Sequence, residues 1–129
     1  MDSDSTGSDS AVKIRHSVSL VVPGYNEEAL VGVNLVRICE YMKKTDDKYD
    51  WEVIFVNDGS ADRTGSIAEE VAKTYTQVKV FHHLTNMNLG NALKTGFAHV
   101  SGEFTITLDL DLSYATDHIG ALLSTLIAT

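Results

Sequence analysis

The stretch SVSLVVPGYNEEALVGVNLVRICEYMKK, residues 17–44, changes its hydrophobic pattern once, at Pro23 and Gly24. Before this pair, residues 17–22 form a short apolar run rich in β-branched side chains, which is typical of a strand. After it, apolar residues recur every three or four positions, as in an amphipathic helix. The stretch therefore predicts a strand, a turn and a helix, with Asn26 as the expected N-cap.

The same alternation of strand and helix continues along the chain. Further strands are predicted at residues 51–56, 78–83 and 103–112, and a last amphipathic helix is predicted from residue 116 onward. Such alternation indicates a mainly parallel sheet that is covered by helices on both faces. We therefore predict a Rossmann-like, three-layer α/β/α domain over residues 12–129.

The composition limits the other possibilities. A length of 129 residues suits one domain, and a net charge of −8 argues against nucleic acid as a partner. Residues 1–11 are mostly polar and acidic, so we expect a disordered tail. The single cysteine, Cys39, fits a small apolar role in a reducing compartment. No signal peptide or run of ~20 apolar residues is visible, so we expect a cytoplasmic location.

The stretch TITLDLDLSY, residues 105–114, ends an apolar strand with two carboxylates. Alternation places Asp109 and Asp111 on the same face as Thr105 and Thr107. An edge strand with one solvated face explains this pattern. Alternatively, two hard anionic oxygens at i and i+2 can share one divalent cation. The ten residues alone leave both interpretations open.

Polar segments follow all four predicted strands, in the order PGYNEE, NDGSAD, TNMNLGN and DLDLS. The carboxyl ends of parallel strands meet at one rim of a sheet, and ligands bind there in open α/β folds. This convergence at one rim favours the metal interpretation of Asp109 and Asp111.

In order and spacing, the segments VVPGYNEE, VNDGSADRT, NMNLGNALKTG and LDLDLS resemble the N-terminal, nucleotide-sugar-binding half of glycosyltransferase family 2 enzymes of GT-A fold. The resemblance covers the chain from about Ser17 to its end. Two of the segments are similar to the branch of dolichyl-phosphate mannose and polyprenyl-phosphate glucose synthases. The resemblance implies an inverting, metal-dependent transfer from a UDP- or GDP-sugar to an acceptor such as a polyprenyl or dolichyl phosphate.

The resemblance also implies roles for individual residues. The residues that it places around the donor are Pro23, Tyr25, Glu27, Asp58, Gly90, Lys94 and Asp109. Of these, Pro23, Tyr25 and Glu27 would embrace the nucleoside, and Asp58 would hydrogen-bond the base. Asn88 stands where the family pattern usually has a glycine, a mild departure if this position needs a left-handed backbone.

Asp109 and Asp111 match the D-x-D motif of the family and are the implied catalytic and metal-binding pair. Asp111 would be the main ligand of Mg²⁺ or Mn²⁺, and Asp109 would support the ribose or the metal. The chemistry agrees, because a diphosphate brought to an acidic chain needs a cation to offset its charge.

Several other polar residues receive structural predictions. Asp62 or Ser60 is expected to cap the helix that follows the second strand. His82 and His83 follow the third strand and would point to opposite faces, so a metal shared between them is not expected. No role is assigned to the remaining histidines.

Two other functional classes were weighed. A dinucleotide-binding oxidoreductase shares the alternation, but VVPGYNEE has one glycine and lacks the G-x-G-x-x-G cradle. A catalytically inactive donor-binding fragment or nucleotide-binding module stays open, because the family's acceptor half follows the D-x-D strand and this chain stops within an amphipathic pattern. We therefore expect a fold that is incomplete at its C-terminus, self-association through exposed apolar surface, and a parent enzyme at the cytoplasmic face of a membrane.

Overall fold

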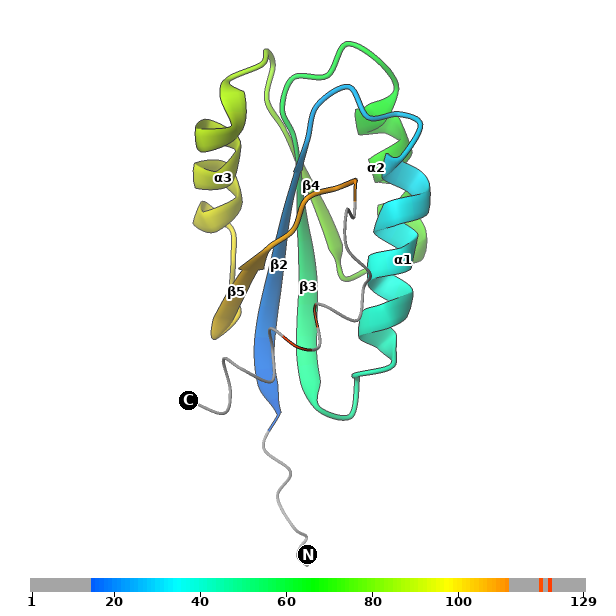
Figure 1. Ribbon diagram of the computed structural model, residues 1–129, viewed down its shortest axis with the longest axis vertical. Coiled ribbons are helices and arrows are strands. Elements are labelled where there is room, and N and C mark those ends of the chain that lie inside the picture. Colours follow the sequence, from blue (N-terminus) through cyan, green and yellow to red (C-terminus); the bar gives the residue numbers. More distant parts are fainter. Residues whose placement is uncertain (1–14, 112–118, 120, 122–129) are drawn as a thin grey trace, which may run out of the picture.

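Strands and helices alternate along the chain as predicted. A computed structural model describes residues 15–111, 119 and 121 (Figure 1). The predicted acidic tail and most of the predicted C-terminal helix lie outside these residues. The elements are β2 (His16–Gly24), α1 (Val31–Lys43), β3 (Tyr49–Asn57), α2 (Thr64–Thr74), β4 (Val78–His82), α3 (Asn88–Ala98) and β5 (Phe104–Thr107).

The four described strands form one sheet in the order β4-β3-β2-β5, and each neighbouring pair is parallel. In the register of the sheet, Val18 of β2 lies opposite Trp51 of β3 and Phe104 of β5. β3 is buried from Trp51 to Asn57 because it is an inner strand with helices over both faces. The carboxyl ends of all four strands therefore point to one rim.

Helices cover both faces of the sheet, which confirms the predicted α/β architecture of three layers (Figure 1). α1 and α2 lie on one face, where the apolar stripe of α1 packs with inward-facing strand residues into the larger core. α3 lies on the other face, where Ala92 packs against Val21, Ile54 and Val56. Ile119, in the predicted C-terminal helix, is fully buried in the larger core.

The start of α1 differs from the prediction, because Asn26 is not its N-cap. The helix begins at Val31, and Leu30 occupies the N-cap position. Asn26 has a φ of 51°, and its side chain accepts a hydrogen bond from the amide of Ala61 in the next loop. A partner in the neighbouring loop thus takes the side chain away from its own helix.

The last described strand is also shorter than predicted, since β5 ends at Thr107. The amide of Leu108 still donates to the carbonyl of Val21 in β2. Two residues later, the carbonyl of Leu110 accepts a hydrogen bond from the side chain of Asn34 on α1, at 2.8 Å. The segment that carries the two aspartates has therefore left the sheet and is held by a helix.

Cys39 lies on α1 and is fully buried in the larger core. Burial raises the pKa of its thiol to about 12, and the neighbouring Glu40 acts in the same direction. These findings agree with the predicted apolar role. Among the described residues, no helix combines the length and apolar character needed to cross a membrane.

Candidate functional site

A cavity of about 450 Å³ lies at the rim where β2 and β3 end, next to the start of α3 and the segment after β5. Its volume is in the range of small-molecule sites. Six of the eight residues that the sequence singled out line this cavity: Pro23, Tyr25, Glu27, Asp58, Asp109 and Asp111. The predicted convergence of the polar segments at one rim is thus present in the fold.

Gly90 and Lys94, the other two, are not among the lining residues. The Lys94 side chain is exposed, and a Cβ built on Gly90 would meet only the Asn88 side chain, at 3.5 Å. α3 reaches the cavity through Asn88 and Leu89 at its start and through Ala92. Asn88 has a φ of 73°, the left-handed backbone that asparagine tolerates better than most residues.

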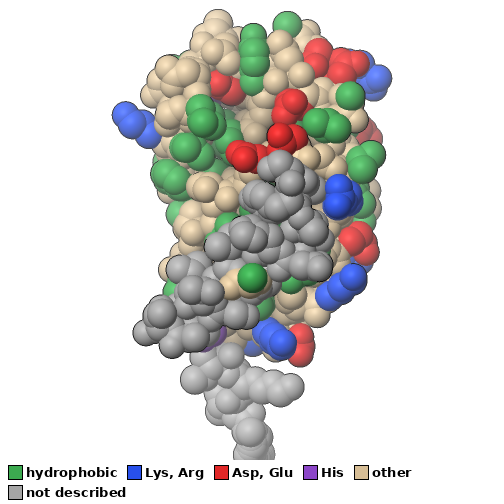
Figure 2. Space-filling view, viewed as in Figure 1, with side chains coloured by type: hydrophobic (Ala, Val, Ile, Leu, Met, Phe, Trp, Pro, Cys, Tyr) green, Lys and Arg blue, Asp and Glu red, His purple; other side chains and the backbone are tan. Residues whose placement is uncertain are grey.

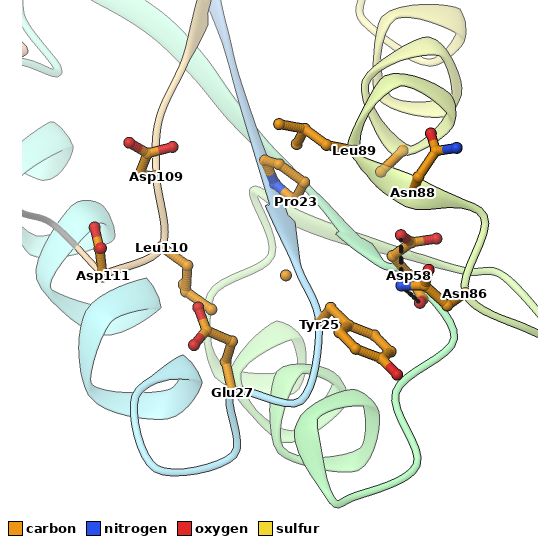
Figure 3. Close-up of a pocket in the computed structure, with 12 residues that line it drawn as sticks. Pro23, Tyr25, Glu27, Asp58, Asn86, Asn88, Leu89, Asp109, Leu110 and Asp111 are labelled. Carbon is orange, nitrogen blue, oxygen red and sulfur yellow. Dashed lines mark hydrogen bonds between the residues drawn. The ribbon is translucent and has the colours of Figure 1, made fainter.

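The lining residues form two sides (Figure 3). Asp58 and Asn86 lie on one side of the cavity, and Asp109 and Asp111 lie on the other, with Pro23 between them. We call the first the nucleoside side and the second the carboxylate side, after the roles that the sequence suggested.

On the nucleoside side, the loop after β2 and the loop after β3 are joined by hydrogen bonds. The amide of Asn26 donates to the Ser60 hydroxyl at 2.9 Å, and the Asn26 side chain accepts from the amide of Ala61 at 2.8 Å. The amide of Glu27 donates to the hydroxyl of the buried Thr64 at 2.7 Å. These bonds satisfy loop amides that would otherwise lack partners, and they fix where Tyr25 and Glu27 enter the cavity.

Asp62 supports the same pair of loops. Its carboxylate accepts from the amide of Thr64 at 2.9 Å and from the amide of Glu28 at 3.3 Å. The hydrogen bond from the Thr64 hydroxyl is the main cause that lowers the pKa of Asp62. The N-cap residue of α2 is Arg63, so Asp62 makes a turn just before the helix rather than the predicted cap.

Asp58 is 4% exposed, and its carboxylate is held from several directions. Oδ1 lies 2.7 Å from Nδ1 of His83 and accepts from the amide of Met87 at 2.9 Å. Oδ2 accepts from the side chain of Asn86 at 3.1 Å. A buried carboxylate needs such partners, because it is costly to remove an anion from water.

Gly59 places the loop that follows Asp58. It has a φ of 72°, and a Cβ at this position would lie 2.1 Å from the carbonyl carbon of Thr85 and 2.3 Å from the amide nitrogen of Asn86. Only glycine combines this backbone conformation with such a close approach. The segment after β4 therefore lies directly against the loop after β3.

On the carboxylate side, burial still alternates after β5 has ended. Leu108 and Leu110 are buried, whereas Asp109 and Asp111 are exposed at the cavity. Asn34, which is 4% exposed, holds the backbone between the two aspartates. The alternation that the sequence predicted is thus present, although the strand itself is shorter.

Two residues that support the site were missed by the sequence reasoning. His83 was considered only as half of a metal site shared with His82, yet it bonds Asp58. The available signal was alternation along the predicted strand 78–83, because it places His83 on the same face as Phe81, which packs against the core beneath α3. Asn34 is a polar residue within the buried face of α1. A buried polar side chain in an apolar stripe requires a partner, and this requirement was the available signal.

The charge of the cavity is uniformly negative. Four carboxylates line it, from Glu27, Asp58, Asp109 and Asp111, and none of its described lining residues is a lysine or arginine. Figure 2 shows acidic side chains gathered on the face that this figure presents, next to hydrophobic ones. An anionic ligand in this cavity would therefore be repelled by its lining unless a cation accompanied it.

The donor set suits a hard divalent cation, since Mg²⁺ and Mn²⁺ prefer carboxylate oxygens. Within residues 15–111, 119 and 121, no group of three or more His, Cys, Asp and Glu side chains could hold an ion. Asp109 and Asp111 would thus supply part of a coordination shell, and ligand oxygens or water would complete it.

The sequence is similar to those of several named transferases. It is 38% identical over 97 residues to the dolichyl-phosphate beta-glucosyltransferase ALG5A of Trichomonas vaginalis, a match that covers 73% of this chain and 30% of the relative. It is 34% identical over 118 residues to the undecaprenyl-phosphate 4-deoxy-4-formamido-L-arabinose transferase of an Enterobacter species, covering 88% of this chain and 34% of the relative. The chain thus spans about a third of the length of these relatives.

Solved structures resemble the fold. The mannosyltransferase PcManGT of Pyrobaculum calidifontis, in complex with GDP-Man and Mn²⁺, matches with a TM-score of 0.67 and 29% identity over 76% of this chain and 28% of that one. Residues 1–349 of S. aureus TarS, in complex with UDP-GlcNAc, match with a TM-score of 0.67 and 25% identity over 84% of this chain and 30% of that one. These neighbours confirm a GT-A glycosyltransferase fold.

A family profile matches most of the sequence. The profile of glycosyl transferase family 2 matches residues 19–129, which include all four segments that carried the resemblance. The chain belongs to glycosyl transferase family 2.

Proposed function

We propose that this chain forms the donor-binding half of a glycosyltransferase that uses a UDP- or GDP-sugar together with Mg²⁺ or Mn²⁺. The observation that carries the proposal is the cavity itself, where four carboxylates and no described basic side chain surround a volume of about 450 Å³. Such a cavity matches a nucleotide diphosphate only when a divalent cation accompanies it.

The names of related proteins support the donor and the acceptor. The structural neighbours hold GDP-Man with Mn²⁺ or UDP-GlcNAc, and the curated relatives act on dolichyl or undecaprenyl phosphates. We infer that the acceptor of the parent enzyme is a polyprenyl or dolichyl phosphate at the cytoplasmic face of a membrane.

On the nucleoside side, the chain's own residues recognise the base and the ribose. Pro23 and the half-exposed ring of Tyr25 offer flat apolar surface to the base. Asp58 directs Oδ2, the oxygen that neither His83 nor Met87 occupies, toward an N–H group of the base. Glu27, which lies between Tyr25 and Leu110 in Figure 3, accepts a hydrogen bond from a ribose hydroxyl.

On the carboxylate side, Asp111 and Asp109 would hold the cation. Bound there, a divalent ion would offset the charge of the diphosphate and stabilise the departing nucleotide. The phosphate of the acceptor is already anionic, so it can attack the anomeric carbon in line, with inversion, without a strong general base. Asp111 and Asp109 then act by orienting the donor.

The test is calorimetric titration of UDP and GDP into the 129-residue chain, with and without Mn²⁺. We expect binding that requires the metal in the wild type and that falls at least tenfold in Asp111→Asn, about 1.4 kcal/mol or more. Asp47→Asn is the matched control, because it makes the same charge change at an exposed residue outside the cavity lining. Equal affinity with and without Mn²⁺ would contradict the metal-dependent function.

A further inference from the structure

We propose that His83 is a positioning residue for base recognition, which holds the carboxylate of Asp58 and ties it to α3 through Thr95. The inference rests on the proposed function, because it assigns the orientation of the group that reads the base. His83 does not line the cavity, so it would act through Asp58 rather than on the ligand.

The geometry joins three elements through one imidazole ring. Nδ1 of His83, just after β4, lies 2.7 Å from Oδ1 of Asp58, just after β3. Nε2 of the same ring lies 2.7 Å from the hydroxyl of Thr95 on α3. The His83 side chain is only 10% exposed, and that of Asp58 is 5% exposed. Both ring nitrogens thus have short contacts in a place that water hardly reaches.

The partners determine where the ring carries its proton. An ionised carboxylate only accepts hydrogen bonds, so Nδ1 of His83 must donate to Asp58. In a neutral ring Nε2 is then an acceptor, and the Thr95 hydroxyl donates to it. The hydrogen bonds thus run from the Thr95 hydroxyl to His83 and from His83 to Asp58. Together with the amide of Met87, His83 occupies Oδ1 of Asp58.

This arrangement has a consequence for the ligand. Oδ1 is occupied by His83 and by the amide of Met87, whereas Oδ2 has the longer bond from Asn86, at 3.1 Å. The carboxylate therefore presents Oδ2, and not Oδ1, to a base in the cavity. Without His83, a buried anion would lose a partner and its preferred rotation.

The preceding residue provides a matched control. His82 also bonds two side chains, Asn57 at 3.0 Å and Glu69 at 2.7 Å, and it contacts no residue of the cavity lining through these bonds. His82→Ala thus removes an imidazole ring from the neighbouring residue, at the end of β4, without removing a bond to the cavity lining.

The experiment compares nucleotide affinity across His83 variants in the presence of Mn²⁺, with thermal unfolding as a check that each variant folds. We expect His83→Ala to weaken UDP or GDP binding by about tenfold or more, since tenfold is near the lower end for a hydrogen bond to a charged group. His83→Asn keeps a donor near the position of Nδ1 and should restore affinity to within about threefold. His83→Gln reaches toward Thr95 instead and should not restore it. Equal loss in His82→Ala and His83→Ala, or no loss in His83→Ala, would overturn the proposal.

A second measurement does not need any nucleotide. Long-range ¹H–¹⁵N spectra of the wild type report which nitrogen of His83 is protonated, and we expect a proton on Nδ1. An unprotonated Nδ1 would overturn the inference, whether or not the protein binds a nucleotide. Conversely, absent binding by the wild type with a protonated Nδ1 would contradict only the proposed function.

Discussion

The two sides of the cavity are built in different ways. On the nucleoside side, three loops hold one another through side chains that bond backbone amides, as Thr64 does for Glu27 and Asp58 does for Met87. On the carboxylate side, the aspartates follow a strand that has ended, and their segment rests on buried leucines and on a bond from Asn34.

The difference suggests how one cavity could recognise a base on one side and hold a cation on the other. Base recognition requires fixed donors and acceptors, and a network that spans three loops fixes them before the ligand arrives. Under the proposed function, Asp109 and Asp111 would take their final geometry together with the cation that they share. Changes on the nucleoside side should therefore affect folding and binding together, whereas changes on the carboxylate side should mainly affect binding that depends on the metal.

The largest effect is expected from a substitution that disrupts the loops of the nucleoside side. Gly59→Ala places a Cβ 2.1 Å from the backbone of Thr85 and forces a left-handed conformation on alanine. We expect a loss of about 3 kcal/mol in the free energy of unfolding, together with loss of nucleotide binding. Urea unfolding monitored by circular dichroism measures the first, and calorimetry the second.

Gly90→Ala is the control for this variant. It lies in α3, where a Cβ meets nothing closer than 3.5 Å and where alanine favours the helix. Its stability should be equal to that of the wild type or higher by up to about 1 kcal/mol. A loss as large as that of Gly59→Ala would show that the close approach of the loops is not the cause.

A smaller effect sharpens the contrast on the carboxylate side. Asn34→Leu keeps the branched shape of the side chain but removes the donor to the carbonyl of Leu110. We expect a cost of about 1 kcal/mol in stability, because a buried carbonyl loses its partner. Mn²⁺-dependent affinity for UDP or GDP should fall as well, because the segment that carries both aspartates loses the bond that holds it. Unchanged affinity in the presence of Mn²⁺ would show that this bond does not position the carboxylate side.

The smallest effect concerns Asp62, whose hydrogen bonds lower its pKa in the folded chain. A lowered pKa means that the ionised form contributes stability above the ordinary Asp value of about 3.9, and that this contribution is lost as the pH falls through the folded-state value. Asp62→Asn should therefore lower the melting temperature at neutral pH and have no effect in strong acid. A difference that does not depend on pH would point to lost geometry rather than lost charge.

Features with a local cause could be predicted from the sequence. The order of strands and helices follows from periods that are visible within ten residues, and the shared rim follows from parallel pairing. These two rules were enough to bring Pro23, Asp58 and Asp111 into one cavity. Alternation also placed Asp109 and Asp111 on one face and Leu110 on the other, and in the structure the two aspartates are exposed whereas Leu110 is buried.

Features with distant causes could not be predicted in this way. Asn26 was expected to cap its own helix, but its partner is Ala61 in another loop. Asn34 bonds a carbonyl that lies 76 residues away along the chain, and His83 bonds an aspartate 25 residues before it. Local patterns say that such side chains need partners, and only the fold says which ones they have.

The burial of Cys39 gives the chain its own reporter of opening. A thiol with a pKa of about 12 reacts slowly with alkylating reagents at neutral pH, and here the core also shields it. Since the chain has no other cysteine, the rate of labelling reports how often the core opens and exposes Cys39. Mass spectrometry of chains treated with an alkylating reagent can thus rank the stability of every variant above.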